Sequence, residues 1–515
     1  MRFTKCHLNG FIPVNKEKII PITKMSSSFN SPIWNQTWDG SAYETGTSIW
    51  KNESYLYTAG YTNSFGAGSS DLLLIKWNTD GSQIWNRTWG GEGIEVGVTV
   101  WGDENFLYTT GYTDSFGAGN FDLFLIKWTT EGNQIWNRTW GGMDDDFVRS
   151  LWGDETYLYT TGLTKSFSPA ICDLVLIKWT TEGNQIWNRT WGGMDSDIGN
   201  TIWGDESFLY TTGYTKSCGK GEGDLLIVKW DTDGTQIWNR TWGGTRLDYV
   251  NSAWGSGSYL YLTGYTGSYS TNDYDLFLTK WDIDGNLIWE QILKGFNYDR
   301  GKSIWSDGLN LYVLGTLNTL GPNIRDFLLI KWDTDGNQIW NQTWGYPEDD
   351  FGYSISGDEI YLYLVGHTKS SFVNEGALFL SKIHKTVLQK PIFQHISPNP
   401  DPDGNITLNW NNVADATSYS LYRNTNQIPK ISGLAPISVS ATTSYSDNNL
   451  TNNTYYYVVV AKDEYRKSDI SNCELVEVQI VPPIPKEGGI SGFPFGSLLS
   501  IWSMSIIFLL VKRRK

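Results

Sequence analysis

Short runs of alternating apolar and polar residues, separated by turn-forming residues, recur along residues 31–388. Between residues 96 and 142, four such runs read VGVTVWGD, NFLYTTGYT, FDLFLIKWT and NQIWNRTWGG. Alternation with a period of two residues predicts β-strands, and the TTEGN that joins the last two runs is typical of a β-hairpin turn. We call the four predicted strands a, b, c and d.

Strand c is apolar on both of its faces. Leu123 and Leu125 would lie on one face, and Phe124 and Ile126 on the other. A strand with two apolar faces is expected to be covered on both sides.

The four-strand pattern is an internal repeat of 51 residues. Marker residues recur in phase through seven copies, with no insertion or deletion. The lysine of strand c recurs at Lys76, Lys127, Lys178, Lys229, Lys280, Lys331 and Lys382, and the first tryptophan of strand d at Trp34, Trp85, Trp136, Trp187, Trp238, Trp289 and Trp340. A lysine lying along apolar neighbours and pairing with Asp or Glu is the favoured interpretation of the first series, and a functional ring of lysines is the alternative.

Four-stranded units at this spacing predict the blades of a β-propeller, packed face to face around an axis. The first copy begins with an isolated strand d at residues 33–38, and the last copy stops after strand c at residues 377–383. The first strand can therefore complete the last blade and remove the open edge of the array. The predicted fold class is all-β, with a seven-bladed propeller over residues 31–388.

Tryptophan is unusually abundant, with 27 residues, and almost all of them belong to the repeat. Large rings of this kind fill the space between sheets, so we expect packing between blades. A sugar-stacking surface is the alternative.

The motifs TDGNQIWNQTWG, LYTTGYT and DLFLIKW resemble the β-propeller repeat of bacterial and archaeal surface proteins. The resemblance covers about residues 31–384. It implies a binding or scaffold role and brings no catalytic residues.

A second module is expected at residues 391–480, where the period ends and strand-like alternation continues. Trp410 is a predicted core residue. Leu450, six residues before Tyr456, resembles the Leu…Tyr corner of fibronectin type III domains. The resemblance implies a fibronectin type III-like β-sandwich.

The C-terminal residues predict a membrane anchor. A Pro/Gly linker at 481–489 precedes 490–511, which carries no charged residue and is long enough for a transmembrane helix. The basic tail 512–515 favours a cytoplasmic C-terminus, so the predicted location is the cell membrane, single-pass, with the propeller outside. A cleaved C-terminal sorting signal is an alternative.

The basic N-terminal segment, residues 1–30, conflicts with that location because it lacks the apolar core of a signal peptide. Either the start of the chain is misassigned or the protein is tail-anchored with its domains in the cytosol. Export is the favoured reading.

The composition of the chain argues against several functions. The formal net charge of −16 argues against binding to nucleic acid, whose phosphates need Lys and Arg. Four scattered cysteines and no CxxC pair indicate neither a zinc site nor a disulfide framework. A single Cys172–Cys218 bridge between neighbouring repeats is one option.

Function is expected in the d–a and b–c loops, because these vary among the copies while the strands barely change. In a propeller both sets of loops lie on one face, where variation on a rigid scaffold favours recognition of a protein or glycan. Drift in surface loops is the alternative. The candidate binding residues are Asp144, Asp145, Asp146, Asp195, Asp197, Asp248, Tyr249, Asp349 and Asp350.

No cofactor is expected. The acidic loops are a candidate Ca²⁺ site, although solvated charge is the favoured interpretation. No nucleophile elbow, phosphate loop or HExxH motif occurs. The predicted role is therefore non-enzymatic: adhesion or envelope scaffolding. A glycan-cleaving enzyme that uses loop carboxylates and a purely structural envelope component are the alternatives.

Strand d carries an Asn-X-Thr sequon in six copies. Because the repeat copies the triplet, the six count largely as one observation. The predicted glycosylation sites are Asn35, Asn86, Asn137, Asn188, Asn239 and Asn341.

Overall fold

The computed structural model describes most of the chain between residues 32 and 482. The described residues are 2–3, 19–21, 29–30, 32–205, 207–270, 273–294, 298–318, 325–345, 348–369, 376–464 and 466–482. All of their regular structure is β-strand apart from turns and bends, with no helix in these ranges.

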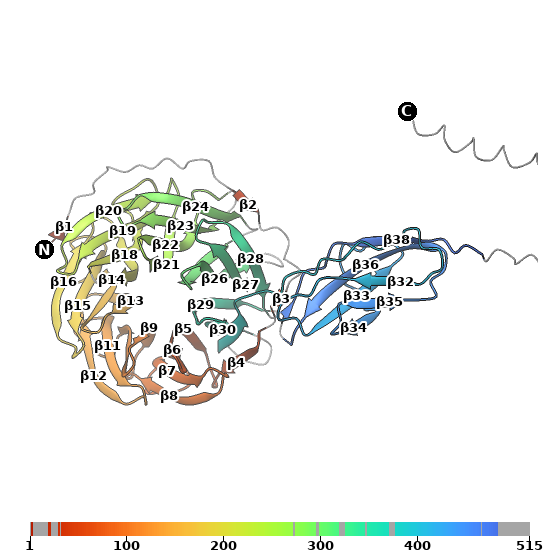
Figure 1. The fold of residues 1–515 in the computed structure, drawn as a ribbon. Helices are drawn as coiled ribbons and strands as arrows, with labels where there is room; N and C mark the ends of the chain where they lie inside the picture. Colours follow the sequence, from red (N-terminus) through yellow and green to blue (C-terminus); the bar gives the residue numbers. More distant parts are fainter. Residues whose placement is uncertain are drawn as a thin grey trace, which may run out of the picture.

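Repeated antiparallel four-stranded sheets form a ring, as in a β-propeller (Figure 1). The first three sheets are β5 (Glu44–Lys51), β6 (Tyr55–Thr62), β7 (Asp71–Asn78) and β8 (Gln83–Trp89); β9 (Glu95–Gly102), β10 (Phe106–Thr113), β11 (Asp122–Thr129) and β12 (Gln134–Trp140); β13 (Asp146–Gly153), β14 (Tyr157–Thr164), β15 (Asp173–Thr180) and β16 (Gln185–Trp191). The next two are β17 (Asp197–Gly204), β18 (Phe208–Thr215), β19 (Asp224–Asp231) and β20 (Gln236–Trp242); β21 (Asp248–Ser256), β22 (Tyr259–Thr266), β23 (Asp275–Asp282) and β24 (Leu287–Lys294).

Two further sheets complete the ring among the described residues. They are β25 (Arg300–Ser306), β26 (Asn310–Asn318), β27 (Arg325–Asp333) and β28 (Gln338–Trp344); β29 (Asp350–Gly357), β30 (Tyr361–Thr368), β31 (Ala377–His384) and β4 (Trp34–Trp38). The short strands β1 (Arg2–Phe3) and β2 (Ile19–Pro21) add in parallel to the outer edges of β16 and β24. Strands a to d of the sequence repeat are therefore the four strands of each sheet, in that order.

The ring closes through β4, the N-terminal strand. It pairs antiparallel with β31, with Trp38 opposite Leu378 and Trp34 opposite Lys382. The first strands of successive sheets also contact one another around the axis, and β29 contacts β5. The predicted closure by the isolated strand is confirmed by this pairing.

Apolar cores lie between neighbouring sheets. Leu123 and Leu125 of β11 pack with Val175 and Ile177 of β15 in one cluster, while Phe124 and Ile126 face the preceding sheet. Trp128 is buried, and its indole nitrogen donates to the hydroxyl of Thr109 at 2.9 Å. Packing between sheets is thus the role of the strand c tryptophans, as predicted.

The repeated lysine of strand c joins adjacent sheets. Lys127 Nζ lies 4.0 Å from the ring centroid of Phe106 and donates to the carbonyl of Thr181, in the c–d turn of the next sheet, at 3.0 Å. Five other members donate in the same way to the equivalent turn. The expected Asp or Glu partner is therefore wrong for these six: a backbone carbonyl and an aromatic face satisfy the buried ammonium group.

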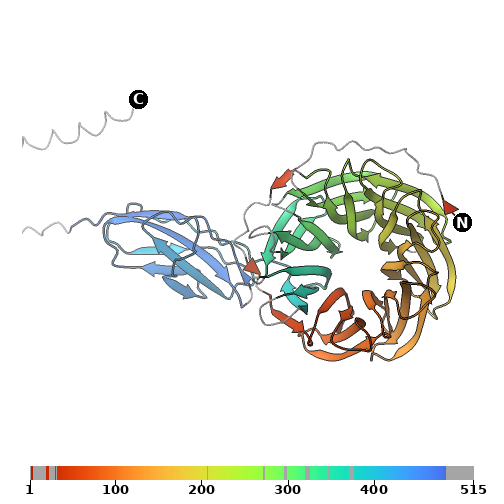
Figure 2. The same ribbon diagram turned by 180° about the vertical axis from the view of Figure 1, so that it is seen from behind.

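A second β unit follows the ring (Figure 2). Its larger sheet contains β3 (Phe29–Asn30), β37 (Arg466–Lys467), β36 (Asn453–Lys462), β33 (Ser418–Asn424), β34 (Ser438–Ser440) and β38 (Glu474–Val478), and its smaller sheet contains β32 (Ile406–Asn409) and β35 (Ser444–Asp447). Both sheets contribute to one apolar core that includes Trp410.

The expected corner at Tyr456 is displaced by one residue. Tyr455 donates its hydroxyl hydrogen bond to the carbonyl of Thr451 at 3.2 Å and lies in the core beside Leu450. Tyr456 lies in the cluster on the other side of the sheet. Because alternate residues of β36 face opposite sides, the core accepts Tyr455 and Tyr457 and excludes the residue between them.

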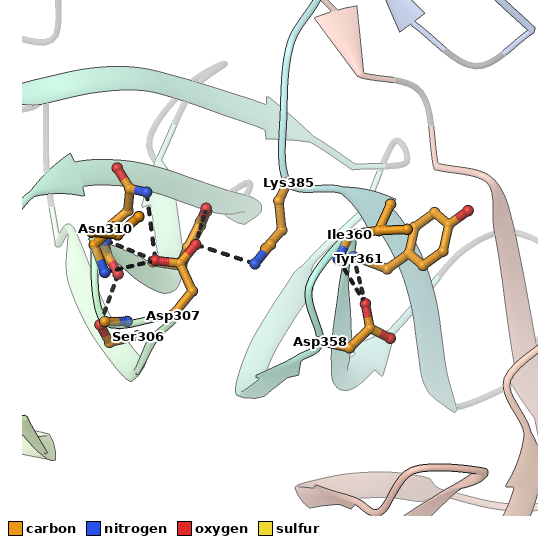
Figure 3. A network of polar contacts seen from close by, with 10 residues as sticks. Ser306, Asp307, Asn310, Asp358, Ile360, Tyr361 and Lys385 are labelled. Atoms are coloured by element: carbon orange, nitrogen blue, oxygen red, sulfur yellow. Dashed lines mark hydrogen bonds and ion pairs between the residues drawn. The ribbon is translucent and has the colours of Figure 1, made fainter. Parts of the chain in front are cut away.

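Polar contacts connect the residues that follow β31 to the ring. Lys385 Nζ lies 3.1 Å from Asp307 Oδ2, and Asp307 Oδ1 accepts the backbone N–H of Asn310 at 2.8 Å (Figure 3). Arg466 of the second unit donates to the hydroxyl of Thr386 at 2.9 Å.

Cys172 and Cys218 are not joined to each other. Cys172 is a free, buried thiol, whereas Cys218 takes part in a disulfide. The suggested bridge between neighbouring repeats is therefore wrong.

The predicted transmembrane helix at 490–511 lies outside the described residues, as do most of 1–30 and 481–489 and all of 512–515. Within the described ranges no helix has the length and apolarity needed to cross a membrane.

Replacing Lys127 with methionine should lower the free energy of unfolding by about 1–3 kcal/mol, because the Thr181 carbonyl loses its charged donor and the ring of Phe106 loses its cation. Urea unfolding followed by tryptophan fluorescence measures the change. Lys165→Met is the matched control: Lys165 forms an exposed ion pair with Asp145 at 2.6 Å, and its loss should cost under about 1 kcal/mol. Equal losses of unfolding free energy for the two substitutions would show that the Lys127 contact between sheets stabilises the fold no more than an exposed ion pair does.

Candidate functional site

The two ends of the ring axis carry different connections. Because successive antiparallel strands reverse direction, the d–a and b–c loops lie at one end and the a–b loops and c–d turns at the other. We call these ends the loop face and the turn face.

Four of the predicted binding residues are buried beneath the loop face. Asp146 begins β13, has no exposed surface, and accepts hydrogen bonds from the Gly142 amide at 2.8 Å and from the Thr164 hydroxyl. Asp197, Asp248 and Asp350 occupy the same position in later sheets and are equally buried. The side chains of Asp146, Asp197 and Asp248 each accept an amide of the preceding d–a loop. None of the four side chains is presented on the surface.

The residue that begins strand c carries a second buried carboxylate. This carboxylate lies close to that of the aspartate that begins strand a. A Cβ atom on Gly243 would fall 2.3 Å from Asp224 Oδ1 and 2.4 Å from Asp248 Oδ2, so the two carboxylates lie on either side of this glycine. Burial, with a smaller contribution from the Asp248 charge, raises the pKa of Asp224 to about 7. Burial likewise raises the pKa of Asp299 to about 8, with Asp275 adding to it.

Sequence reasoning missed this second carboxylate, although its periodicity was visible. The residues are Asp71, Asp122, Asp173, Asp224, Asp275 and Asp326. An acid that repeats strictly at a strand end indicates a structural role, because recognition residues would differ between copies.

The other predicted residues lie at or near the surface but on different sheets. Asp144 is exposed, Asp145 pairs with Lys165, and Asp349 accepts the backbone N–H of Arg325 at 3.1 Å. Asp144 and Asp145 are neighbours in the loop before β13, whereas Asp349 belongs to the loop before β29. The structure does bring together Asp195 and Tyr249.

Asp195 and Tyr249 line a pocket of about 540 Å³ on the loop face. Its wall is formed mainly by Asp195, Tyr214, Lys216, Glu222, Tyr249 and Tyr265. Aromatic walls with a few polar groups are typical of ligand sites.

A somewhat larger pocket of about 660 Å³ opens on the turn face, beside Asp154, Lys178 and Asp205. Its lining repeats in the other sheets and has structural partners. Asp154 and Asp205 accept backbone N–H groups of their own a–b loops, and Lys178 donates to the Thr232 carbonyl. We therefore regard the loop-face pocket as the candidate site.

Three tyrosines and an arginine stack in order along the loop face. The ring centroids of Tyr214 and Tyr249 are 5.6 Å apart, and those of Tyr249 and Tyr265 are 5.2 Å apart with their planes inclined by 14°. The guanidinium carbon of Arg300 lies 4.6 Å from the Tyr265 ring. We call Tyr214, Tyr249, Tyr265 and Arg300 the tyrosine ladder.

Tyr214, Tyr265 and Arg300 were not predicted. Tyr214 and Tyr265 lie on strand b, at a position that holds tyrosine in four of the seven copies and therefore gave no distinguishing signal. The signal for Arg300 lay in strand a, whose second residue varies between copies. That position holds Thr45, Val96, Phe147, Ile198, Tyr249, Arg300 and Phe351.

No group of three or more His, Cys, Asp or Glu side chains in the described residues is arranged to hold a metal ion. The candidate calcium ligands thus lie either in buried pairs or on separate loops.

The sequons differ in exposure. Asn35, Asn86, Asn137 and Asn188 are exposed on the outer strands. Asn239 and Asn341 are only 6% and 7% exposed, so these two side chains are not open to modification in this fold. The other four stay predicted glycosylation sites.

No family model and no curated protein matches the chain. Among solved structures, the extracellular domain of the proposed one-component system BT4673 from B. thetaiotaomicron is 11% identical, with a TM-score of 0.40 over 90% of this chain. This chain spans 59% of that one. The β-propeller domain of the Trilobed protease from Pyrococcus furiosus is 12% identical, with a TM-score of 0.41, over 68% of this chain and 97% of its own. FN3tt, at 22% identity and a TM-score of 0.16, covers 18% of this chain and 97% of its own.

The buried carboxylates make stability depend on pH. The folded protein holds a proton on Asp224 up to about pH 7, whereas the unfolded chain releases it near pH 4. The folded state therefore binds more protons in this window, and the free energy of unfolding should fall as pH rises from 5 to 8.

Asp224→Asn should reduce that fall, because the amide cannot ionise next to Asp248. Thermal melts at pH 5 and pH 8 measure the effect, with the exposed turn residue Asp233→Asn as control. An unchanged difference in Tm between the two pH values would contradict the assignment.

Proposed function

We propose that this protein is a non-enzymatic binding protein of the cell surface, in which a seven-bladed propeller recognises a protein or glycan through its loop face. The observation that carries the proposal is the tyrosine ladder beside the Asp195 pocket. Tyr249 and Arg300 occupy a position that differs between copies, and they stack against strand b tyrosines of the repeat. Such a rigid aromatic surface binds with little loss of conformational entropy.

Binding is favoured over glycan hydrolysis by the environment of the carboxylates. Glycosidases need two carboxyl groups facing a shared substrate space. Here the close pairs, such as Asp224 and Asp248, are buried around a glycine and hold loops. The surface acids Asp144, Asp195 and Asp349 belong to different loops.

The remaining parts fit a surface protein. The second unit would be a fibronectin type III-like spacer, and residues 490–511 would anchor the chain with the basic tail in the cytoplasm. Strand pairing of β4 with β31 supports a closed propeller that stays rigid outside the membrane. Adhesion and envelope organisation are the roles that this arrangement serves.

Tyr249→Ala and Tyr265→Ala should each weaken binding of hits on a defined glycan array by about tenfold or more, as truncation of an aromatic anchor does. Tyr157→Ala, on the turn face, is the matched control and should leave binding unchanged. Release of reducing ends from the bound glycans would show an enzyme instead. Hits that respond equally to all three substitutions would contradict the loop face as the site.

External protease added to intact cells should degrade the propeller of the full-length protein, detected by an antibody to the loop face. Permeabilised cells provide the control for antibody access. A propeller that is degraded only after permeabilisation would overturn the surface location.

A further inference from the structure

Three cationic side chains gather next to the tyrosine ladder, in a protein whose net charge is −16. Arg300 and Lys302 come from β25, and Arg325 begins β27. Arg300 and Arg325 lie close enough to Lys302 to act on its pKa, which burial and these two charges lower to about 8. Lys302 therefore still carries most of its charge at neutral pH.

This cluster has no counterion among the described residues. No carboxylate there forms an ion pair with the side chains of Arg300, Lys302 or Arg325. The nearby Asp349 accepts only the backbone N–H of Arg325. Arg300 Nε is shielded from solvent and has no hydrogen-bond partner among the residues that the structure describes. An unpaired buried donor on a cation is costly, which indicates that an anionic partner is missing.

Aromatic rings hold the three cations in place. Arg300 lies against Tyr265, Arg325 Cζ lies 5.2 Å from the Phe351 ring, and Lys302 Nζ lies 6.0 Å from the Tyr353 ring. Cation–π contacts fix position without neutralising the charge. The cluster is therefore oriented and remains able to bind anions.

Lys302 and Tyr353 also occupy a distinctive position in the repeat. A β-bulge in each strand a leaves one residue unpaired, and in β25 that residue is Lys302. Three other bulge residues reach the next inner strand through neutral side chains: Thr47 donates to the Gly97 carbonyl, Asn200 to the Val250 carbonyl and Asn251 to the Gly301 carbonyl. The bulge residue of β13 is a second cation, Arg149. A bulge re-aims a side chain without changing the sheet, so it lets these two blades present a cation where others satisfy the backbone.

We propose that Arg300, Lys302 and Arg325, together with the tyrosine ladder, bind an oligosaccharide that carries carboxylate or sulfate groups. This inference rests on the proposed function and names the ligand class. The tyrosine rings offer apolar faces to sugar rings, and the guanidinium groups offer paired donors to the acidic substituents. An acidic protein segment would pair with the cations, but it has no sugar rings to stack on the tyrosine ladder beside the pocket.

The test measures binding of the purified full-length protein in detergent. Isothermal titration uses oligogalacturonate for carboxylate, dextran sulfate oligomers for sulfate, maltoheptaose as the neutral sugar and poly-glutamate as the acidic peptide. We expect binding of one or both acidic glycans, at least tenfold weaker binding of the other two, and loss of affinity as NaCl rises.

Arg300→Gln and Lys302→Gln should each weaken binding of the acidic glycan about tenfold to hundredfold, and Lys302→Arg should largely retain it. Lys430→Gln removes the same charge from an exposed site of the second unit and is the matched control. Circular dichroism and Tm of each variant check that the fold is intact. If Arg300→Gln does not fold, Lys302→Gln and Arg325→Gln decide the result.

The outcomes separate this inference from the proposed function. Equal affinity for maltoheptaose and the acidic glycans, with sensitivity to Tyr249→Ala, would overturn the anionic ligand and leave loop-face binding intact. Tightest binding of poly-glutamate would replace the glycan by an acidic protein. Acidic glycan binding that is unaffected by Lys302→Gln, Arg325→Gln and Tyr249→Ala would overturn both.

Discussion

Contact between adjacent blades is the constraint on which the rest of this structure depends. Each strand c is apolar on both faces, so no sheet can bury its residues without a neighbour on each side. Lysines of six strands c add a directional contact, because each ammonium group lies on an aromatic ring of its own sheet and donates to a turn of the next. A linear array would leave its two terminal sheets uncovered, and pairing of β4 with β31 removes that problem.

The same constraint explains where variation is tolerated. Strands b, c and d are held by the sheets on either side, and even the first carboxylate of strand a is committed to holding a loop. Positions that differ between copies lie in the d–a and b–c loops, at the second residue of strand a and at the bulge of strand a. Tyr249, Arg300 and Lys302 occupy such positions, so recognition chemistry is concentrated where the packing requirement is weakest.

The burial of its aspartates changes the interpretation of the acidic loop face. In the sequence these loops carry acidic residues that are candidates for calcium binding or catalysis. In the structure Asp146, Asp197, Asp248 and Asp350 are buried, and the first three accept hydrogen bonds from loop amides. Burial raises the pKa of Asp197 and Asp248, and it raises the pKa of the neighbouring Asp224 to about 7. The exposed electrostatics near the inner strands are instead cationic at Arg300, Lys302 and Arg325.

The sequence alone determined the repeated four-stranded sheets, the order of their strands and the closing role of residues 34–38, because strand periodicity and the 51-residue step are local and cumulative signals. It also placed Trp410 in the core of the second unit. Only the tertiary structure decided which predicted site residues face solvent, that Tyr455 and not Tyr456 forms the corner, and that Tyr214, Tyr249, Tyr265 and Arg300 stack. Those properties depend on contacts that form only in the folded chain. The order of the residues alone does not show which variable positions come into contact.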